Sequence, residues 1–287
     1  MRFAVLASGS SGNCSLVDNG ESAFLIDAGI GPRSLEKTLA AIGTPLDRVQ
    51  GLVLTHTHAD HWNIRTISLC LKNNIPWWCH PLHGRELARV APFQELQAAG
   101  LVRHYQGNPF ETRPGWNWRP IPLAHDASAT HGFLLRVQTQ MGNPRSIGYL
   151  ADLGSWNDET LEIMKSLDLL ALEFNHDPAM QIQSSRPPFL ISRIMGDRGH
   201  LSNQQGKTFL SRLGTLALPR HLVQIHLSEM CNLPELARTA ALEALDKAGA
   251  DTQVHTATGK YPALVVNLLE KSLFARTRRA TAPETAF

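Results

Sequence analysis

The 287-residue chain has few cysteines, little net charge and no long apolar run. Its four cysteines are scattered and form no C-x-x-C pair, so we expect a soluble protein of a reducing, cytoplasmic compartment. No stretch approaches a membrane span, and the apolar run in residues 1–7 is too short for the core of a signal peptide, so no membrane partner is expected. The net charge of +2 gives no global positive field, and a nuclease would therefore need a local basic groove.

The composition, with 43% hydrophobic residues, allows a substantial core. Apolar strands alternate with helical patterns, which predicts an α/β layered fold. There is no short-period repeat and no Pro/Ser-rich linker. We therefore expect a single domain over residues 1–270 with two pseudo-duplicated halves, followed by a flexible tail at 271–287.

A metal-binding pattern follows the apolar run at residues 49–54, which is predicted to be a buried strand. Four strong donors lie within six residues: His56, His58, Asp60 and His61. Residues two apart in an extended chain point the same way, so His56 and His58 can face one ion. Asp60 and His61 come after the chain turns and suit a second ion. Imidazole with carboxylate favours Zn²⁺, Mn²⁺ or Fe²⁺.

Three later segments repeat this design, in which an apolar strand ends at an isolated donor. The donors are His125 after residues 120–124, Asp152 after residues 147–151, and His226 after residues 221–225. In α/β sheets such strand ends converge on one edge, where sites are built. The sequence therefore predicts that these donors join the first cluster.

Two features near the start can be interpreted in two ways from the residues alone. The Gly/Ser loop at residues 8–13 is either a tight turn or a set of backbone N–H and hydroxyl groups that contacts an anion. Asp27 ends the third expected strand, where its carboxylate either orients a neighbouring histidine or binds turn amides.

These motifs together resemble those of the metallo-β-lactamase-fold hydrolases. The segment T-H-T-H-A-D-H at residues 55–61 matches the H-x-H-x-D-H signature, and I-D-A-G at residues 26–29 matches the early Asp motif. Further motifs are similar to the YycJ/WalJ-like branch, which is related to RNase Z-type nucleases: A-S-G-S-S-G-N, A-D-L-G, F-N-H-D, G-D-R-G-H-L-S-N and H-L-S-E-M-C-N. One departure is Thr57, where relatives often carry Glu.

The resemblance implies a four-layer αββα sandwich and a site for two divalent ions. One ion is expected on His56, His58 and His125, and the other on Asp60, His61 and His226, with Asp152 bridging them. The implied activity is a phosphodiesterase, most specifically a 5′ to 3′ DNA exonuclease, in which a metal-bridging hydroxide attacks phosphorus.

The catalytic residues expected beside the ions are Asp60, which orients the nucleophile, and a histidine that protonates the leaving group. His200 resembles a non-ligand catalytic histidine of RNase Z enzymes, and the alternative is a helix cap. His176 is a second candidate or a loop anchor. Glu173 is expected either to orient His200 or only to support the metal ligands.

Substrate phosphate is expected at Ser10, Ser11, Asn13 and Arg198, with Arg186 and Arg193 as further basic candidates. Two other functions fit the residues: hydrolysis of a small ester, such as a cyclic phosphodiester, thioester or lactone, and metal-dependent regulation without turnover. The sequence leaves the physiological metal, the strandedness of the substrate and the formation of a homo-oligomer open.

Overall fold

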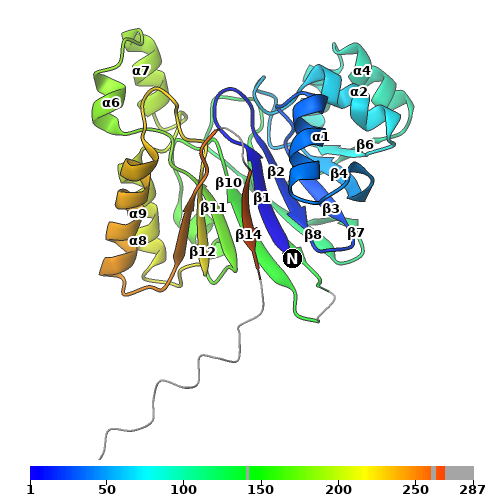
Figure 1. Ribbon diagram of the computed structural model, residues 1–287. Helices are drawn as coiled ribbons and strands as arrows, with labels where there is room; N and C mark the ends of the chain where they lie inside the picture. Colours follow the sequence, from blue (N-terminus) through cyan, green and yellow to red (C-terminus); the bar gives the residue numbers. More distant parts are fainter. Residues whose placement is uncertain (140–141, 260–262, 269–287) are drawn as a thin grey trace, which may run out of the picture.

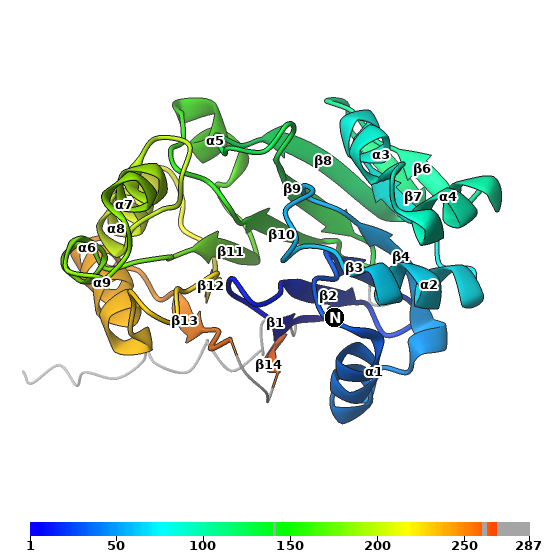
Figure 2. The same cartoon turned by 90° about the horizontal axis from the view of Figure 1, so that it is seen from above.

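The computed structural model describes residues 1–139, 142–259 and 263–268, and the expected tail at 271–287 lies outside these ranges. Two seven-stranded mixed sheets face each other in the described part, with helices on their outer faces (Figures 1 and 2). The first sheet has the order β14 (Leu264–Asn267), β1 (Arg2–Ala7), β2 (Cys14–Asp18), β3 (Ala23–Ile26), β4 (Val49–Val53), β5 (Trp77–Cys79) and β6 (Val102–His104). The second has the order β13 (Gln253–Thr256), β12 (His221–Ile225), β11 (Leu169–Glu173), β10 (Arg145–Leu150), β9 (His131–Val137), β8 (Trp116–Pro122) and β7 (Phe110–Arg113).

Helices cover both sheets and complete the predicted four-layer αββα sandwich, which is confirmed. Those on the first sheet are α1 (Pro32–Ala41), α2 (Ile64–Lys72), α3 (Pro81–Leu87) and α4 (Ala91–Ala98), and a short 3₁₀ turn spans Leu46–Arg48. Those on the second are α5 (Asp158–Ile163), α8 (Asn203–Leu213) and α9 (Pro234–Lys247). Two further helices, α6 (Pro178–Ile182) and α7 (Pro188–Met195), stand beyond the edge of the sheets (Figure 1). No helix among the described residues is both long and apolar enough to cross a bilayer.

The core between the sheets is rich in aromatic residues. They lie on the strand faces that point toward the opposite sheet. On β8, Trp116 and Trp118 are buried whereas Asn117 and Arg119 are exposed, as expected for a strand with one face on a core. The ring of Phe24 from the first sheet lies 4.7 Å from that of Trp116, centroid to centroid. This contact is one of many between the two sheets in their shared core.

The two sheets share one pairing pattern. Counted from β14 in the first sheet and from β7 in the second, three antiparallel pairings are followed by three parallel ones, and the change occurs at β3 and at β10. This common order supports the proposal of one domain built from two related halves.

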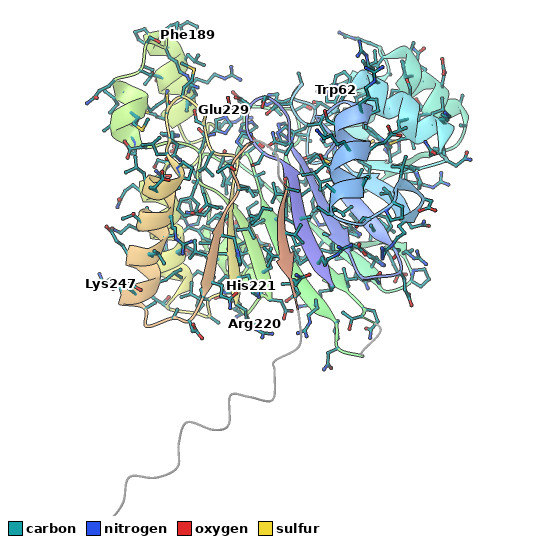
Figure 3. All side chains as sticks on the ribbon, in the orientation of Figure 1. Trp62, Phe189, Arg220, His221, Glu229 and Lys247 are labelled. Carbon is teal, nitrogen blue, oxygen red and sulfur yellow. The ribbon has the colours of Figure 1, made fainter. Side chains whose placement is uncertain are left out.

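The parallel strands direct their carboxyl ends toward one edge of the molecule. Figure 3 shows His221, the first residue of β12, at the opposite end from Glu229, which follows that strand. The loops that carry the predicted metal donors therefore gather at the edge below α6 and α7.

Proline and asparagine set where several of these helices begin. The helix α1 begins at Pro32, with Gly31 as its N-cap, because proline is well suited to the first turn. The helix α2 is capped by the Asn63 side chain, which accepts the backbone N–H of Arg65. The helices α3 and α4 each carry a proline in the first turn, Pro81 and Pro92.

Candidate metal centre

Three of the predicted site residues lie at strand ends and have a left-handed backbone conformation. Asp27 after β3, Asp152 after β10 and His226 after β12 have φ values of 60°, 56° and 60°. The left-handed conformation is costly for residues other than glycine, and such residues gather at functional sites. Each of these residues turns the chain sharply, so its side chain stays at the strand end.

The structure brings the predicted donors into two groups. The ligand atoms of His56, His58 and His125 lie within 4.8 Å of one another, and so do those of Asp60, His61 and His226. Within the first group, Nδ1 of His58 is 3.2 Å from Nε2 of His125. Within the second, Oδ2 of Asp60 is 3.5 Å from Nε2 of both His61 and His226. These are the two sets that the family resemblance implies for two ions.

Asp152 lies between the two groups. Its Oδ2 is 3.0 Å from Nε2 of His61, and its Oδ1 is 3.4 Å from Nε2 of His226 and 3.9 Å from Nε2 of His125. Oδ1 therefore faces a ligand from each group, and Oδ2 faces His61 of the second group. A carboxylate placed in this way can bind two cations, as the bridging prediction requires.

The donor set suits divalent cations by its chemistry. Nε2 of His56 and Nε2 of His226 are buried and have no hydrogen-bond partner among the described residues, which is costly unless another group binds them. Burial alone would lower the pKa of His226, but the carboxylates of Asp152, Asp60 and Glu173 raise that pKa to about 10. The same centre holds the pKa of Asp152 well below its usual value, because the neighbouring imidazoles outweigh the effect of burial. The cluster therefore favours positive charge at its centre.

Asp27 supports His61 from behind. Its Oδ2 is 2.7 Å from Nδ1 of His61, which leaves Nε2 of that ring facing the second group. Asp27 also accepts hydrogen bonds from the backbone N–H and the hydroxyl of Thr55 at 2.8 Å each. Both alternatives considered for this residue, a histidine contact and a turn-amide contact, are therefore present, and together they fix the ring orientation.

Asn13 and Gly29 hold the turn that contains Asp60. The Asn13 amide donates to Oδ2 of Asp60 at 3.0 Å, and its backbone N–H donates to the Asp60 carbonyl at 2.7 Å. A Cβ on Gly29 would lie 1.8 Å from the same carbonyl oxygen, so only glycine fits there. Asn13 is buried, and its contacts favour a positioning role over contact with substrate phosphate.

Glu173 connects a predicted ligand with the candidate proton donor. Its Oε1 is 2.8 Å from Nδ1 of His226 and 2.8 Å from Nδ1 of His200, while Oε2 accepts from the backbone of Leu153 at 3.0 Å. His200 lines the cavity beside the ligands, so Nε2 is the ring nitrogen left for a substrate. His176, in contrast, is 1% exposed and does not line this cavity, and burial lowers its pKa to about 4.

A cavity of about 200 Å³ opens above the donors. Its lining residues are Ser10, His58, Asp60, Asp152, Asn175, Arg186, Arg193, Ile194, His200, His226 and Ser228. Ser10 therefore lies where the substrate prediction put it, whereas Ser11 is exposed outside the lining. Arg198 donates from Nε and Nη2 to the His125 carbonyl at 3.1 and 2.8 Å, which points to a role in holding His125.

Two residues near the donors were missed in the sequence. Ser8 accepts the backbone N–H of His226 at 2.7 Å, and Asp126 places Oδ1 3.5 Å from Nε2 of His58. Asp126 also pairs with Arg193 of α7. The signal for Asp126 was available, because a carboxylate directly follows the strand-end His125.

Comparisons with known proteins found similar sequences and a similar fold. The sequence model of a beta-lactamase superfamily domain matches residues 22–227. The exodeoxyribonuclease WalJ of Streptococcus pneumoniae is 27% identical over 265 residues, covering 88% of this chain and 93% of WalJ. The exodeoxyribonuclease YycJ of Bacillus anthracis is 25% identical over 272 residues, covering 91% and 97%. The crystal structure of the metallo-beta-lactamase fold protein YhfI from Bacillus subtilis superposes with a TM-score of 0.63 at 16% identity, covering 93% of this chain and 99% of YhfI.

Proposed function

The chain belongs to the beta-lactamase superfamily, and on that premise we propose that it is a metal-dependent phosphodiesterase that degrades DNA as an exonuclease from the 5′ end. The exodeoxyribonuclease names of two relatives that match most of this chain support the proposed substrate. The 5′ to 3′ direction and a cytoplasmic location complete the proposal.

The observation that carries the proposal is the arrangement around Asp152. Two groups of three donors flank this carboxylate, and His200 lies 3.5 Å from its Oδ1. A hydrolase for phosphodiesters needs a place for cations, a group that orients the attacking water and a proton donor for the leaving oxygen. All three roles can be filled by residues that line one cavity.

The residues that would hold the cations are His56, His58 and His125 on one side, Asp60, His61 and His226 on the other, and Asp152 between them. Bound Zn²⁺, Mn²⁺ or Fe²⁺ would lower the pKa of water and offset the negative charge of the phosphate. Two such ions are part of the proposal.

The protein's own groups have separate tasks. Asp60 is fixed by the Asn13 amide and lines the cavity, where its carboxylate can accept a hydrogen bond from the attacking water and orient it. His200 is held at Nδ1 by Glu173 and can protonate the leaving oxygen from Nε2. Ser10 lines the same cavity and can donate to a phosphate oxygen.

The direct test incubates purified protein with Mn²⁺ or Zn²⁺ and single- or double-stranded DNA labelled at one end or the other. We expect stepwise release of nucleotides from the 5′ end, and no release by the His58→Ala variant prepared in parallel. Equal cleavage by that variant would point to a contaminating nuclease and would refute the assignment.

Two simpler measurements separate the alternatives. Turnover of a thioester but not of bis-p-nitrophenyl phosphate would favour a small-ester hydrolase. Elemental analysis that finds one metal ion or none per chain would favour a metal-dependent regulatory protein without turnover. We expect phosphodiester turnover and about two metal ions per chain.

A further inference from the structure

Two guanidinium groups line the cavity beside the metal donors without taking part in either donor group. They belong to Arg186 and Arg193, on the segment that contains α6 and α7. This segment, residues 178–195, stands above the edge of the sheets, and Phe189 lies near its tip (Figures 1 and 3). No residue of α7 is fully buried, although its apolar residues Leu190, Ile191 and Ile194 are half-buried.

Arg186 is held from two sides. Its Nη1 donates to Oε1 of Gln181, a fully buried residue of α6, at 2.9 Å, and its Nη2 lies 3.4 Å from the hydroxyl of Ser228. Ser228 follows the predicted ligand His226 and lines the same cavity. The guanidinium is therefore fixed between α6 and a strand-end loop of the donor site.

Arg193 is held from a third direction. Its Nε donates to Oδ2 of Asp126, whose Oδ1 lies 3.4 Å from Nε2 of His125. The two Nη groups of Arg193 have no hydrogen-bond partner in the described part of the chain, and a guanidinium offers five N–H donors. Arg193 can therefore keep its contact with Asp126 and still donate to a ligand in the cavity.

We propose that Arg186 and Arg193 form a subsite for a second phosphate group of the substrate, the one adjacent to the scissile phosphodiester. This inference rests on the proposed nuclease function and adds what the protein recognises beside the bond that it cuts. Planar guanidinium groups bind phosphate oxygens in pairs, which fixes both the position and the orientation of the ligand.

The charges of the cavity support this division of tasks. Asp60 and Asp152 line the part next to the predicted ligands, and Asp126 lies just beyond Arg193. These carboxylates repel phosphate unless cations cover them. The two arginines are the cationic side chains that line this cavity apart from the histidines, so an additional phosphate is favoured next to them.

The second phosphate can be a phosphodiester further along the strand or a phosphate monoester at the strand end. A monoester carries nearly two negative charges at neutral pH and matches two guanidinium groups. Three thymidine substrates distinguish the sources: TpT has only the scissile phosphate, TpTpT adds a flanking phosphodiester, and pTpT adds a terminal phosphate.

The test compares kcat and KM for these substrates between wild-type protein and the Arg186→Ala and Arg193→Ala variants. We expect each variant to lose roughly 10- to 100-fold more in kcat/KM on TpTpT or pTpT than on TpT, chiefly through KM. If the loss in kcat/KM is larger on TpTpT, the second phosphate is a flanking phosphodiester; if it is larger on pTpT, the second phosphate is a terminal monoester. Lys247→Ala removes one exposed positive charge at the far end of α9 and is the matched control (Figure 3).

An equal loss on all three substrates, or a loss of bound metal in the arginine variants, would overturn the subsite. Calorimetric binding of pTpT to the full-length protein decides the matter without turnover. If no substrate is cleaved, the nuclease proposal fails, while weaker pTpT binding by Arg186→Ala and Arg193→Ala would still support the subsite. If DNA is cleaved but pTpT binds all variants equally, only the subsite fails.

Discussion

Oε1 of Glu173 lies 2.8 Å from Nδ1 of His200, and both residues belong to the edge where the parallel strands end. The same oxygen is equally close to His226, so one buried carboxylate orients a predicted metal ligand and the candidate proton donor together. A change at Glu173 should therefore affect metal binding and catalysis at once.

Replacing Glu173 by Gln keeps the shape of the side chain and removes its charge. We expect metal affinity or kcat to fall about 10- to 100-fold, as is usual when a group that orients a metal ligand is changed. Metal titration and steady-state kinetics measure the two effects. Glu162→Gln, at an exposed ion pair with Lys165, should match wild type. Unchanged metal binding and kcat in Glu173→Gln would contradict the shared role.

Replacing His200 by Ala should separate proton donation from metal binding. His200 also has a ligand atom within 4.8 Å of those of Asp152, Glu173 and His226, but its Nδ1 is bound to Glu173 and it belongs to neither group of three proposed ligands. We therefore expect the variant to keep its metal while kcat falls by about 10²- to 10⁴-fold. Substrates with better leaving groups, such as bis-p-nitrophenyl phosphate, should be less affected since they need no proton to depart. Loss of metal from the variant would assign His200 to the ligands instead.

Removing the metal should lower stability as well as abolish activity. Without a cation, Nε2 of His56 and of His226 are left buried without a partner. At an ion concentration about 1,000-fold above Kd, binding stabilises the folded state by about 4 kcal/mol, so a chelator should lower the melting temperature. The melting temperature of Asp152→Asn should respond much less to the chelator. The same large shift in that variant would place the stabilising ion elsewhere.

Asp18 should make folding sensitive to acid away from the site. Its side chain is 1% exposed and accepts from Arg2 at 2.6 Å, from Thr44 at 2.9 Å and from the backbone of Gly20 at 2.7 Å. Burial alone would raise its pKa, but these hydrogen bonds outweigh burial and lower the pKa below 3.8.

Because the folded-state pKa of Asp18 is lowered, its contribution is complete above the ordinary pKa and is lost as the pH falls through the folded value. We expect Asp18→Asn to reduce the free energy of unfolding by about 1–3 kcal/mol at pH 7. Denaturant titrations should show the gap to wild type shrinking below about pH 4. A gap that is constant with pH would show that the carboxylate charge is not involved.

Gly29→Ala should disturb the metal turn through the backbone. The new Cβ would lie 1.8 Å from the Asp60 carbonyl oxygen, so the turn must move. We expect a loss of about 3 kcal/mol or more in unfolding free energy, together with weaker metal binding. Gly107→Ala is the matched control, since its Cβ would meet no atom within 4 Å. Normal metal content and stability in Gly29→Ala would contradict the close approach.

The strand-end donors could be located in the sequence because each one follows an apolar run. Asp152 and His226 follow β10 and β12, whose parallel arrangement brings their carboxyl ends to one edge. His125 follows β8, which reaches the same edge because the antiparallel strand β9 lies between β8 and β10. The alternation of strand and helix likewise indicated the layered fold.

Contacts that depend on the path of loops could not be predicted from the pattern of apolar runs in the sequence. Asn13 and Arg198 carry groups suited to phosphate, yet the structure directs them to Asp60 and to the His125 carbonyl. His176 and His200 both follow short polar motifs, and only the packing of their loops places one in the cavity and buries the other. Spacing along the chain does not encode these directions.

The left-handed residues at the strand ends have a consequence for how such a protein can diversify. Asp152 and His226 hold their donor atoms before the chain turns away, so the loops that follow them begin beyond the metal centre. A graft that exchanges the loop after His226 but keeps its contacts to Asn175, for example, would remodel the cavity wall around Ser228. New specificities could therefore arise by loop exchange on an unchanged reactive centre.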